Sequence, residues 1–166
     1  ESALLAAQLL SAKPRGVLKI SASVAFGKLH IAPAMPEFLE RYPEIQVQLV
    51  LTDRFVDLAE EGFDLVIRLS ENPGLNLVAR RLTPIRYVVC AAPAYLDRMG
   101  MPETPLDLAS HNCLFYAYES SQDLWRFEGP DGQTVVKIGG NFQVNSSEAI
   151  REALLGGLGI SLAPTF

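Results

Sequence analysis

Cysteine and long apolar stretches are both scarce in this sequence. Its 166 residues include two cysteines, Cys90 and Cys113. Because these form no CxxC pair and have no histidine cluster nearby, neither a disulfide scaffold nor a zinc site is indicated. No window approaches the roughly 18 unbroken apolar residues of a membrane span, and the apolar start of the chain lacks the basic front and cleavage site of a signal peptide. We therefore expect a cytoplasmic protein with no membrane partner.

Positive charge is also in deficit. The chain carries 14 Lys and Arg against 19 Asp and Glu, which gives a formal net charge of -5. Such a surface repels a phosphate backbone more than it attracts one, so the chain alone is expected to bind DNA poorly. The composition, 49% hydrophobic and 20% charged, is that of one globular domain or two small lobes.

Motifs that support catalysis are missing as well. The sequence has no GxSxG, no HExxH, no P-loop and no GxGxxG that follows a strand. The glycines within 156–159 lie at a helix end, and Glu60 and Glu61 are adjacent on a predicted helix, so their side chains diverge. His30 and His111 are isolated, and lone histidines of this kind are more often structural than catalytic. We expect no catalysis, no cofactor and no metal site.

The most informative feature that is present runs from Thr52 to Arg68 and follows the predicted strand Ile45–Leu51. Apolar residues at helical spacing predict a helix that Thr52 or Asp53 caps and that Gly62 ends through a positive φ. A short apolar strand follows the glycine. This strand, helix and strand order predicts a parallel sheet, and parallel sheets bind ligands at the carboxyl ends of their strands.

The rest of the chain also alternates between strand-like and helix-like segments. Prolines predict a kink or restart in the second helix, with Pro33 near its first turn. A glycine-containing turn between two β-like segments predicts a hairpin. The predicted strands are Val17–Ser21, Ile45–Leu51, Asp64–Leu69, Arg86–Ala92, Phe142–Val144 and Ile160–Ala163; the predicted helices are residues 1–13, Phe26–Arg41 and Ser147–Leu155; the hairpin pairs Trp125–Phe127 with Thr134–Ile138; a turn is predicted at Ser70–Leu75, and an irregular connection with a helix at Met99–Leu114.

Several segments closely resemble the effector-binding domain of LysR-type transcriptional regulators. They cover nearly the whole chain in the expected order. Their sequences are ISASVAFGKLHIAPAMPEFLERYPEIQVQLVLTDRFVDLAEEGFDLVIR, LVARRL, CAAPAYL, PLDLASHNCL and VNSSEAIREALLGGLGISLAP.

This resemblance implies an α/β fold of two lobes, like the type 2 periplasmic binding proteins. By that pattern residues 1–14 are the end of a linker helix, 15–86 form lobe one, and 87–166 form lobe two and the start of the crossover back. Lobe one is then expected to be incomplete at its C-terminus, and the winged helix-turn-helix that contacts DNA is absent from the chain. The resemblance also implies a homo-oligomer, a dimer or tetramer, in which helices Pro33–Arg41 and Ser147–Leu155 meet; alternatively, their apolar stripes simply face their own sheets.

The candidate ligand site follows from the predicted parallel sheet. The carboxyl ends of the strands bring together Ser21, Ser23, Thr52, Arg68 and Ser70, and the hydroxyls lie near helix starts, which favour anions. The resemblance supports Ser23 and Thr52 as effector contacts. Arg68 can hold a carboxylate with two donors, or can instead pair with Asp64 or Glu71.

A second part of the site is predicted at the start of the last helix. Asn145 and Ser146 are placed there in the same way, on the opposite side of the expected cleft. The alternative for all of the Ser, Thr and Asn residues is that they are ordinary helix N-caps.

The sequence therefore predicts the ligand-sensing domain of a LysR-type regulator, which binds a small anionic effector between two lobes. Two other functions stay open at this point. One is the solute-binding component of a transporter, which shares the lobe architecture but is disfavoured by the missing signal peptide. The other is a small α/β enzyme, which the missing nucleophile, cofactor loop and metal cluster disfavour.

Overall fold

A computed structural model describes residues 13–54, 56–58, 60–69, 77–117, 123–130 and 132–166. The chain divides into two compact units, Glu1–Glu71 (unit 1) and Asn72–Phe166 (unit 2). In the described ranges no helix has both the length and the apolar character needed to cross a lipid bilayer. The predicted linker helix at residues 1–13 and the turn at Ser70–Leu75 lie almost entirely outside the described residues, and the predicted lobe boundary after residue 86 stays a prediction.

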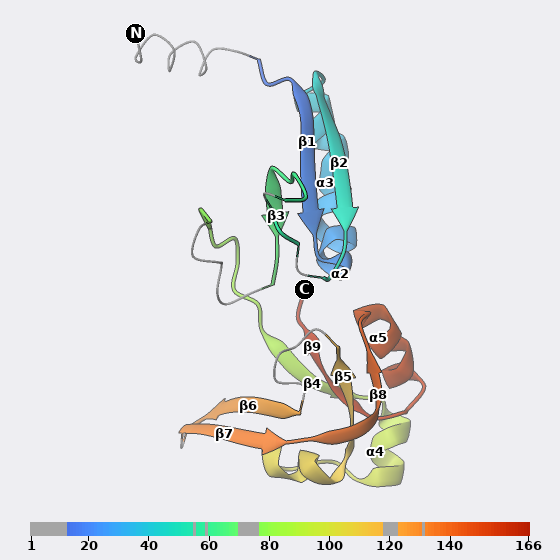
Figure 1. The fold of residues 1–166 in the computed structure, drawn as a ribbon. Helices are drawn as coiled ribbons and strands as arrows, with labels where there is room; N and C mark the ends of the chain where they lie inside the picture. The colour runs from blue at the N-terminus through green and yellow to red at the C-terminus, as the bar shows by residue number, and fades with distance from the viewer. Residues whose placement is uncertain (1–12, 55, 59, 70–76, 118–122, 131) are drawn as a thin grey trace. The chain divides into compact units, whose positions relative to one another are not determined.

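Unit 1 is built on a three-stranded parallel sheet with the order β2-β1-β3 (Figure 1). Its strands are β1 (Gly16–Ala22), β2 (Ile45–Leu51) and β3 (Leu65–Ile67). The predicted parallel pairing is confirmed on both sides of β1. Along β2, half-buried apolar residues alternate with exposed Gln46, Gln48 and Val50, so one face of the strand packs and the other meets solvent.

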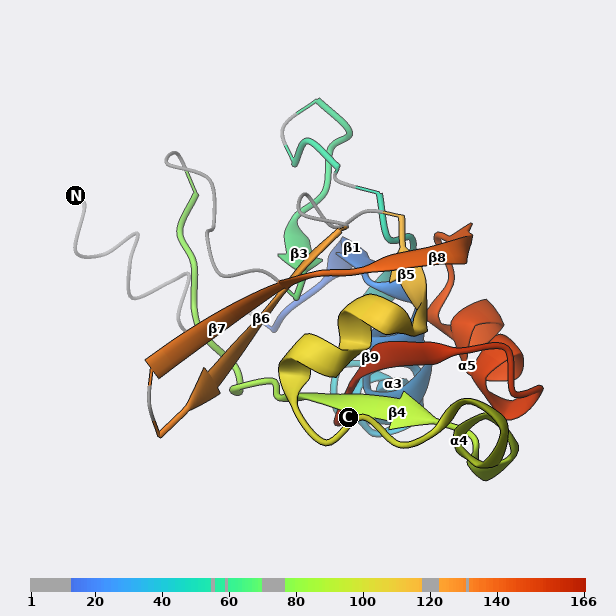
Figure 2. The same ribbon diagram turned by 90° about the horizontal axis from the view of Figure 1, so that it is seen from below.

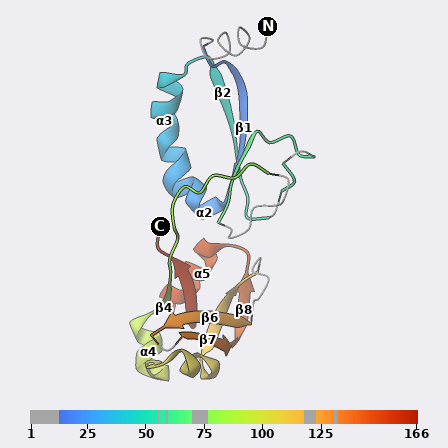
Figure 3. The ribbon, with the colours of Figure 1, turned by 90° about the vertical axis from the view of Figure 1, so that its left-hand side faces the viewer.

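A continuous helical segment connects β1 to β2 and runs alongside them (Figure 3). It consists of α2 (Val24–Phe26), a π-helical stretch η1 (Gly27–Ile31) and α3 (Ala32–Arg41). Pro33 lies in the first turn of α3 and Pro36 lies inside it. Since proline has no N–H to donate, the regular ladder is broken at this point, and the predicted restart of the helix near Pro33 is confirmed.

The predicted helix between β2 and β3 is wrong, because the described residues of that connection contain turns and no helix. One helical turn forms, in which the N–H of Glu61 donates to the carbonyl of Asp57 at 3.1 Å. Asp53, one of the two predicted caps, instead accepts from the N–H of Val24 at 2.9 Å, so it does not start a helix here. The prediction for Gly62 is confirmed, with φ of 64°.

Unit 2 contains a four-stranded sheet with the order β4-β9-β5-β8 (Figure 2). Strand β4 pairs antiparallel with β9, whereas β9, β5 and β8 run parallel. The predicted hairpin is confirmed as the antiparallel pair β6 and β7. The elements of unit 2 are β4 (Tyr87–Ala91), α4 (Pro93–Met99), η2 (Pro105–Ser110), β5 (Asn112–Tyr116), β6 (Leu124–Gly129), β7 (Gly132–Lys137), β8 (Gly139–Val144), α5 (Ser147–Leu155) and β9 (Ile160–Pro164).

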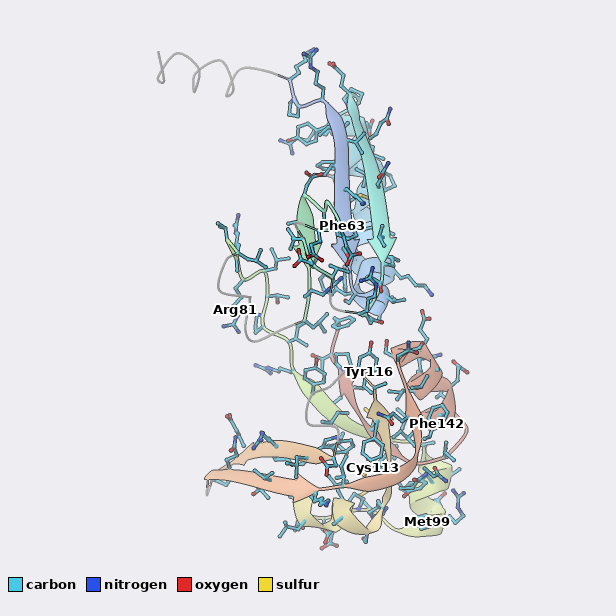
Figure 4. The ribbon with its side chains drawn as sticks, viewed as in Figure 1. Phe63, Arg81, Met99, Cys113, Tyr116 and Phe142 are labelled. Carbon is cyan, nitrogen blue, oxygen red and sulfur yellow. The ribbon has the colours of Figure 1, made fainter. Side chains whose placement is uncertain are left out.

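The core of unit 2 gathers side chains from its helices, its sheet and its hairpin. It includes Cys113, which is labelled in Figure 4 and is fully buried; burial raises the pKa of this free thiol to about 11. The hydroxyl of Tyr95 accepts from the N–H of Asn112 at 3.0 Å and lies 3.1 Å from Nδ1 of His111. The core residues are Tyr95, Leu108, Cys113, Trp125, Val136, Ile138 and Ile160.

Candidate ligand-binding site

Three of the predicted residues form a row across the carboxyl edge of the sheet in unit 1. Ala22 of β1 is opposite both Leu51 of β2 and Ile67 of β3. The next residue is Ser23 after β1, Thr52 after β2 and Arg68 after β3. Because neighbouring strands lie about 4.8 Å apart, the parallel register brings these three residues to the same level.

Arg68 is anchored in this row by hydrogen bonds and retains one unused donor. Its Nη2 donates to Oγ of Ser21 at 2.7 Å, and its Nη1 donates to the carbonyl of Ile67 at 3.2 Å. Its Nε is buried and has no hydrogen-bond partner among the residues that the structure describes. Burial lowers the pKa of Arg68, the carboxylate of Asp53 raises it and Arg54 lowers it. A guanidinium nevertheless stays protonated in proteins, so the row contains a fixed cation.

The predicted alternative for Arg68, an ion pair with Asp64, does not form. The Oδ2 of Asp64 instead accepts from the N–H of Lys19 at 2.9 Å. The other suggested partner, Glu71, lies outside the described residues. Ser21 is fully buried and acts as an acceptor for Arg68, which places it behind the row.

Ser23 has the position of an N-cap without acting as one. It precedes α2 with extended backbone angles, φ -61° and ψ 147°, but its side chain makes no cap hydrogen bond. The Oδ1 of Asp53 accepts from the N–H of Val24 in its place. The Oγ of Ser23 is buried and, within the described part of unit 1, has no hydrogen-bond partner. The capping alternative is therefore wrong for this residue.

Thr52 is half-buried at the end of β2, where its N–H continues the ladder by donating to the carbonyl of Ala22 at 2.9 Å. Its Oγ1 accepts from the N–H of Arg54 at 3.4 Å. This is a long, local turn contact, and no helix starts at this residue. The hydroxyl thus has one weak contact and lies at the edge where the row ends.

Asn145 and Ser146 belong to unit 2, at the end of β8 and the start of α5. The Oγ of Ser146 accepts from the N–H of Ala149 at 3.2 Å, so this residue is the N-cap of α5, as the capping alternative predicts. Asn145 is exposed. Their predicted contact with a ligand stays a prediction.

The sequence-based assignment missed the charged residues that surround Arg68. Local sequence patterns predict Asp53 only as a helix cap, although an acid that directly follows a strand and Thr52 is also a signal for a site residue. Arg54 and Glu61 form a two-point ion pair, with N to O distances of 2.8 and 2.5 Å. The hydrogen bond from Arg54 is the main reason why the pKa of Glu61 is lowered. Glu61 also joins this loop to β1, because its carbonyl accepts from Nζ of Lys19 at 2.7 Å.

Unit 2 has a hollow of about 260 Å³ that is mostly apolar. None of its lining residues is a predicted site residue, and neither of the buried polar atoms without a partner belongs to it. The hollow is lined by Tyr87, Val89, Arg126, Phe127 and Leu162.

The row in unit 1 can bind an oxyanion. Arg68 offers a cationic N–H donor and Ser23 a hydroxyl, and both Arg68 Nε and Ser23 Oγ lack partners within the described part of the chain. Within those same ranges, no group of three or more His, Cys, Asp and Glu side chains is arranged to hold a metal ion. The arrangement therefore suits binding by hydrogen bonds and charge.

Comparisons with known proteins give a consistent result. The family described as LysR substrate binding domain matches residues 11–166. The transcriptional activator TtdR of Escherichia coli K12 is 34% identical over 154 residues, which cover 92% of this chain and 50% of that protein. The transcriptional regulator DmlR of the same strain is 32% identical over 150 residues, which cover 90% of this chain and 49% of that protein. The chain thus spans about half the length of these curated relatives.

The fold is similar to solved structures as well. The regulatory domain of CrgA, a LysR-type transcriptional regulator from Neisseria meningitidis, superposes with a TM-score of 0.76 at 32% identity. The match covers 91% of this chain and 74% of that one. A longer CrgA structure gives a TM-score of 0.78 at 31% identity and covers 98% of this chain and 56% of that one.

Proposed function

The chain belongs to the LysR substrate-binding domain family of transcriptional regulators, and we propose that it is the ligand-sensing domain of such a regulator. Family membership confirms the predicted α/β fold of the periplasmic-binding-protein type. The relatives are transcriptional regulators and not enzymes, in agreement with the prediction of no catalysis, and none supports the transporter alternative.

The effector is proposed to be a small oxyanion, a carboxylate above all, held at the carboxyl edge of the sheet in unit 1. One observation supports this proposal. The buried side-chain atoms of the described residues that lack a hydrogen-bond partner are Ser23 Oγ and Arg68 Nε, and both lie in the row that the parallel register creates. A buried unsatisfied polar group costs about 1–3 kcal/mol. A carboxylate that accepts from both groups would remove that cost.

The regulatory step is proposed to be a population shift. An effector that binds one arrangement of the lobes better than another stabilises that arrangement in proportion to the difference in affinity. In the whole protein this change would pass through a homodimer or homotetramer to winged helix-turn-helix domains that hold DNA. With its net charge of -5 the present chain is suited to sensing and not to contacting DNA itself. Its two cysteines are free thiols, which fits the reducing cytoplasm.

The site can be tested by titrating the chain with small carboxylates and following the chemical shifts of the Arg68 Nε–H group. Arg68→Gln is expected to weaken binding of the best carboxylate by about 10- to 100-fold, because it removes a charge-assisted hydrogen bond. Ser23→Ala and Thr52→Ala are expected to weaken it by about 3- to 10-fold each, the effect of a neutral hydrogen bond.

Arg41→Gln is the matched control, since Arg41 is an exposed guanidinium of the same unit at the end of α3. Its affinity should equal that of the unmodified chain. Unchanged affinity in Ser23→Ala, Thr52→Ala and Arg68→Gln would show that the ligand binds elsewhere. If no carboxylate bound at all, the anionic effector would be the wrong class.

A further inference from the structure

Three charged residues lie around Arg68 at the carboxyl edge of unit 1. The charges that act on the guanidinium of Arg68 belong to Asp53, Arg54 and Glu61. Arg54 and Glu61 form a two-point ion pair and offset each other. Arg68 is therefore left with Asp53 as its counterion.

The carboxylate of Asp53 is held in place next to the row. Its Oδ1 accepts from the N–H of Val24 at 2.9 Å, which ties it to the residue after Ser23. On its other side, the carbonyl of Arg54 accepts from Nη2 of Arg68 at 3.5 Å, a long contact that brings the backbone after Asp53 to the guanidinium. Asp53 thus lies between Thr52 of the row and a backbone group that Arg68 contacts.

We propose that Asp53 determines the charge class of the ligand, so that the site takes a small monoanion and discriminates against a dianion. This inference rests on the proposed function, because it assumes that a carboxylate binds at Arg68. The first negative group of a ligand is attracted by the guanidinium of Arg68. A second negative group in the same region would be repelled by the carboxylate of Asp53, whose charge acts on Arg68. Part-buried charges are only weakly screened by salt, so this repulsion persists at physiological ionic strength.

The decisive variant is Asp53→Asn. Its side-chain oxygen can still accept from the N–H of Val24, so the change removes the charge and keeps the hydrogen bond. Asp57→Asn is the matched control, because Asp57 lies in the same loop, its Oδ1 likewise accepts from a backbone N–H, that of Glu60, and its charge is not among those that act on Arg68.

The experiment compares butyrate with succinate, which have equal carbon number and differ by one carboxylate, at constant ionic strength. The unmodified chain is expected to bind butyrate about tenfold more tightly than succinate, the effect of one uncompensated charge at partial screening. Asp53→Asn is expected to tighten succinate binding about tenfold and butyrate binding about threefold, so the preference shrinks. Asp57→Asn should leave the ratio of the two dissociation constants unchanged.

The outcomes separate this inference from the proposed function. Weaker binding of both ligands by Arg68→Gln would show that both bind through Arg68. If the ratio of their dissociation constants is then the same in Asp53→Asn as in the unmodified chain, the role of Asp53 is wrong and the proposed site stands. Tighter binding of succinate by the unmodified chain would also overturn the role of Asp53, and this measurement needs no variant to fold. If neither ligand binds, or if binding survives Arg68→Gln, the proposed site itself is wrong.

Discussion

The two units differ in where they bury their side chains. Unit 2 has a core to which its helices, strands and hairpin all contribute, with Trp125 and Tyr95 at 4% and 2% exposure. Among the described residues of unit 1, the buried side chains are Ile20, Ser21 and Ala22, near the end of β1, together with Phe63, which is labelled in Figure 4. Helix α3 buries none of its residues.

In unit 1 the best-packed residues lie next to the proposed ligand site. In unit 1 the buried segment Ile20–Ala22 leads directly into the row that contains Ser23 and Arg68. A ligand at the row would therefore stabilise the part of unit 1 that is best packed.

The largest effect is expected from Gly140→Ala in unit 2. A Cβ at Gly140 would lie 1.8 Å from the carbonyl oxygen of Cys113, a backbone atom that cannot move without disturbing the pairing of β5 with β8. Overpacking of this kind should cost about 3 kcal/mol or more. Urea unfolding followed by the fluorescence of Trp125, the single tryptophan, measures it.

Gly139→Ala is the control for that substitution, because a Cβ there meets nothing within 4 Å. Its unfolding midpoint should stay close to that of the unmodified chain. In unit 1, Gly27→Ala should be milder than Gly140→Ala, since its Cβ would meet the movable end of the Leu51 side chain. Equal losses at Gly140 and Gly139 would contradict the close packing described for β8.

A smaller effect is expected from the two buried serines, one in each unit. Ser21→Ala removes the acceptor of a charge-assisted bond from Arg68 and should cost about 1.5–3 kcal/mol. Ser161→Ala removes a neutral bond that its Oγ donates to the carbonyl of Leu114 and should cost about 1 kcal/mol. Amide hydrogen exchange measures the loss of stability in each unit separately. Only Ser21→Ala should also weaken carboxylate binding, and equal effects on binding would place the ligand outside the row.

The smallest effect is expected from acid. Arg54 lowers the pKa of Glu61 in unit 1, and the N–H and hydroxyl of Thr104 lower the pKa of Asp107 in unit 2. A lowered pKa means stabilisation that is present above the unfolded value and is lost as the pH falls through the folded one. The losses should therefore start near pH 4.5 for Glu61 and near pH 3.8 for Asp107.

Thermal unfolding from neutral pH downwards measures this difference. Glu61→Gln should be less stable than the unmodified chain at neutral pH and should match it once the pH falls well below the unfolded value for Glu61. The stability of Asp107→Asn should match that of the unmodified chain only at a lower pH. Glu61 is half-buried and Asp107 is exposed, so each effect should be small, and an early and large loss of stability would point to a different group.

Local patterns predicted most of the regular elements. Strand Ile45–Leu51 and helix Ser147–Leu155 have the predicted bounds, and the cap at Ser146 and the positive φ of Gly62 are confirmed. These features depend on neighbouring residues, so the sequence is sufficient for them. The predicted helix before Gly62 is not found in the described residues, and its predicted cap Asp53 instead bonds to the N–H of Val24, a residue 29 positions away that no local pattern reveals.

The sequence alone determined the alternation of strands and helices, the family, and the choice of Ser21, Ser23, Thr52 and Arg68 as candidates. Only the tertiary structure decided which of these side chains have partners. Ser21 accepts a hydrogen bond from Arg68, and Asp53 accepts from the N–H of Val24 at the start of α2, where Ser23 makes no cap bond. Ser23 Oγ and Arg68 Nε have no partners among the described residues. The physical reason is that periodicity and capping act over one or two turns, whereas hydrogen bonds and charges at the sheet edge join residues brought together by the parallel register.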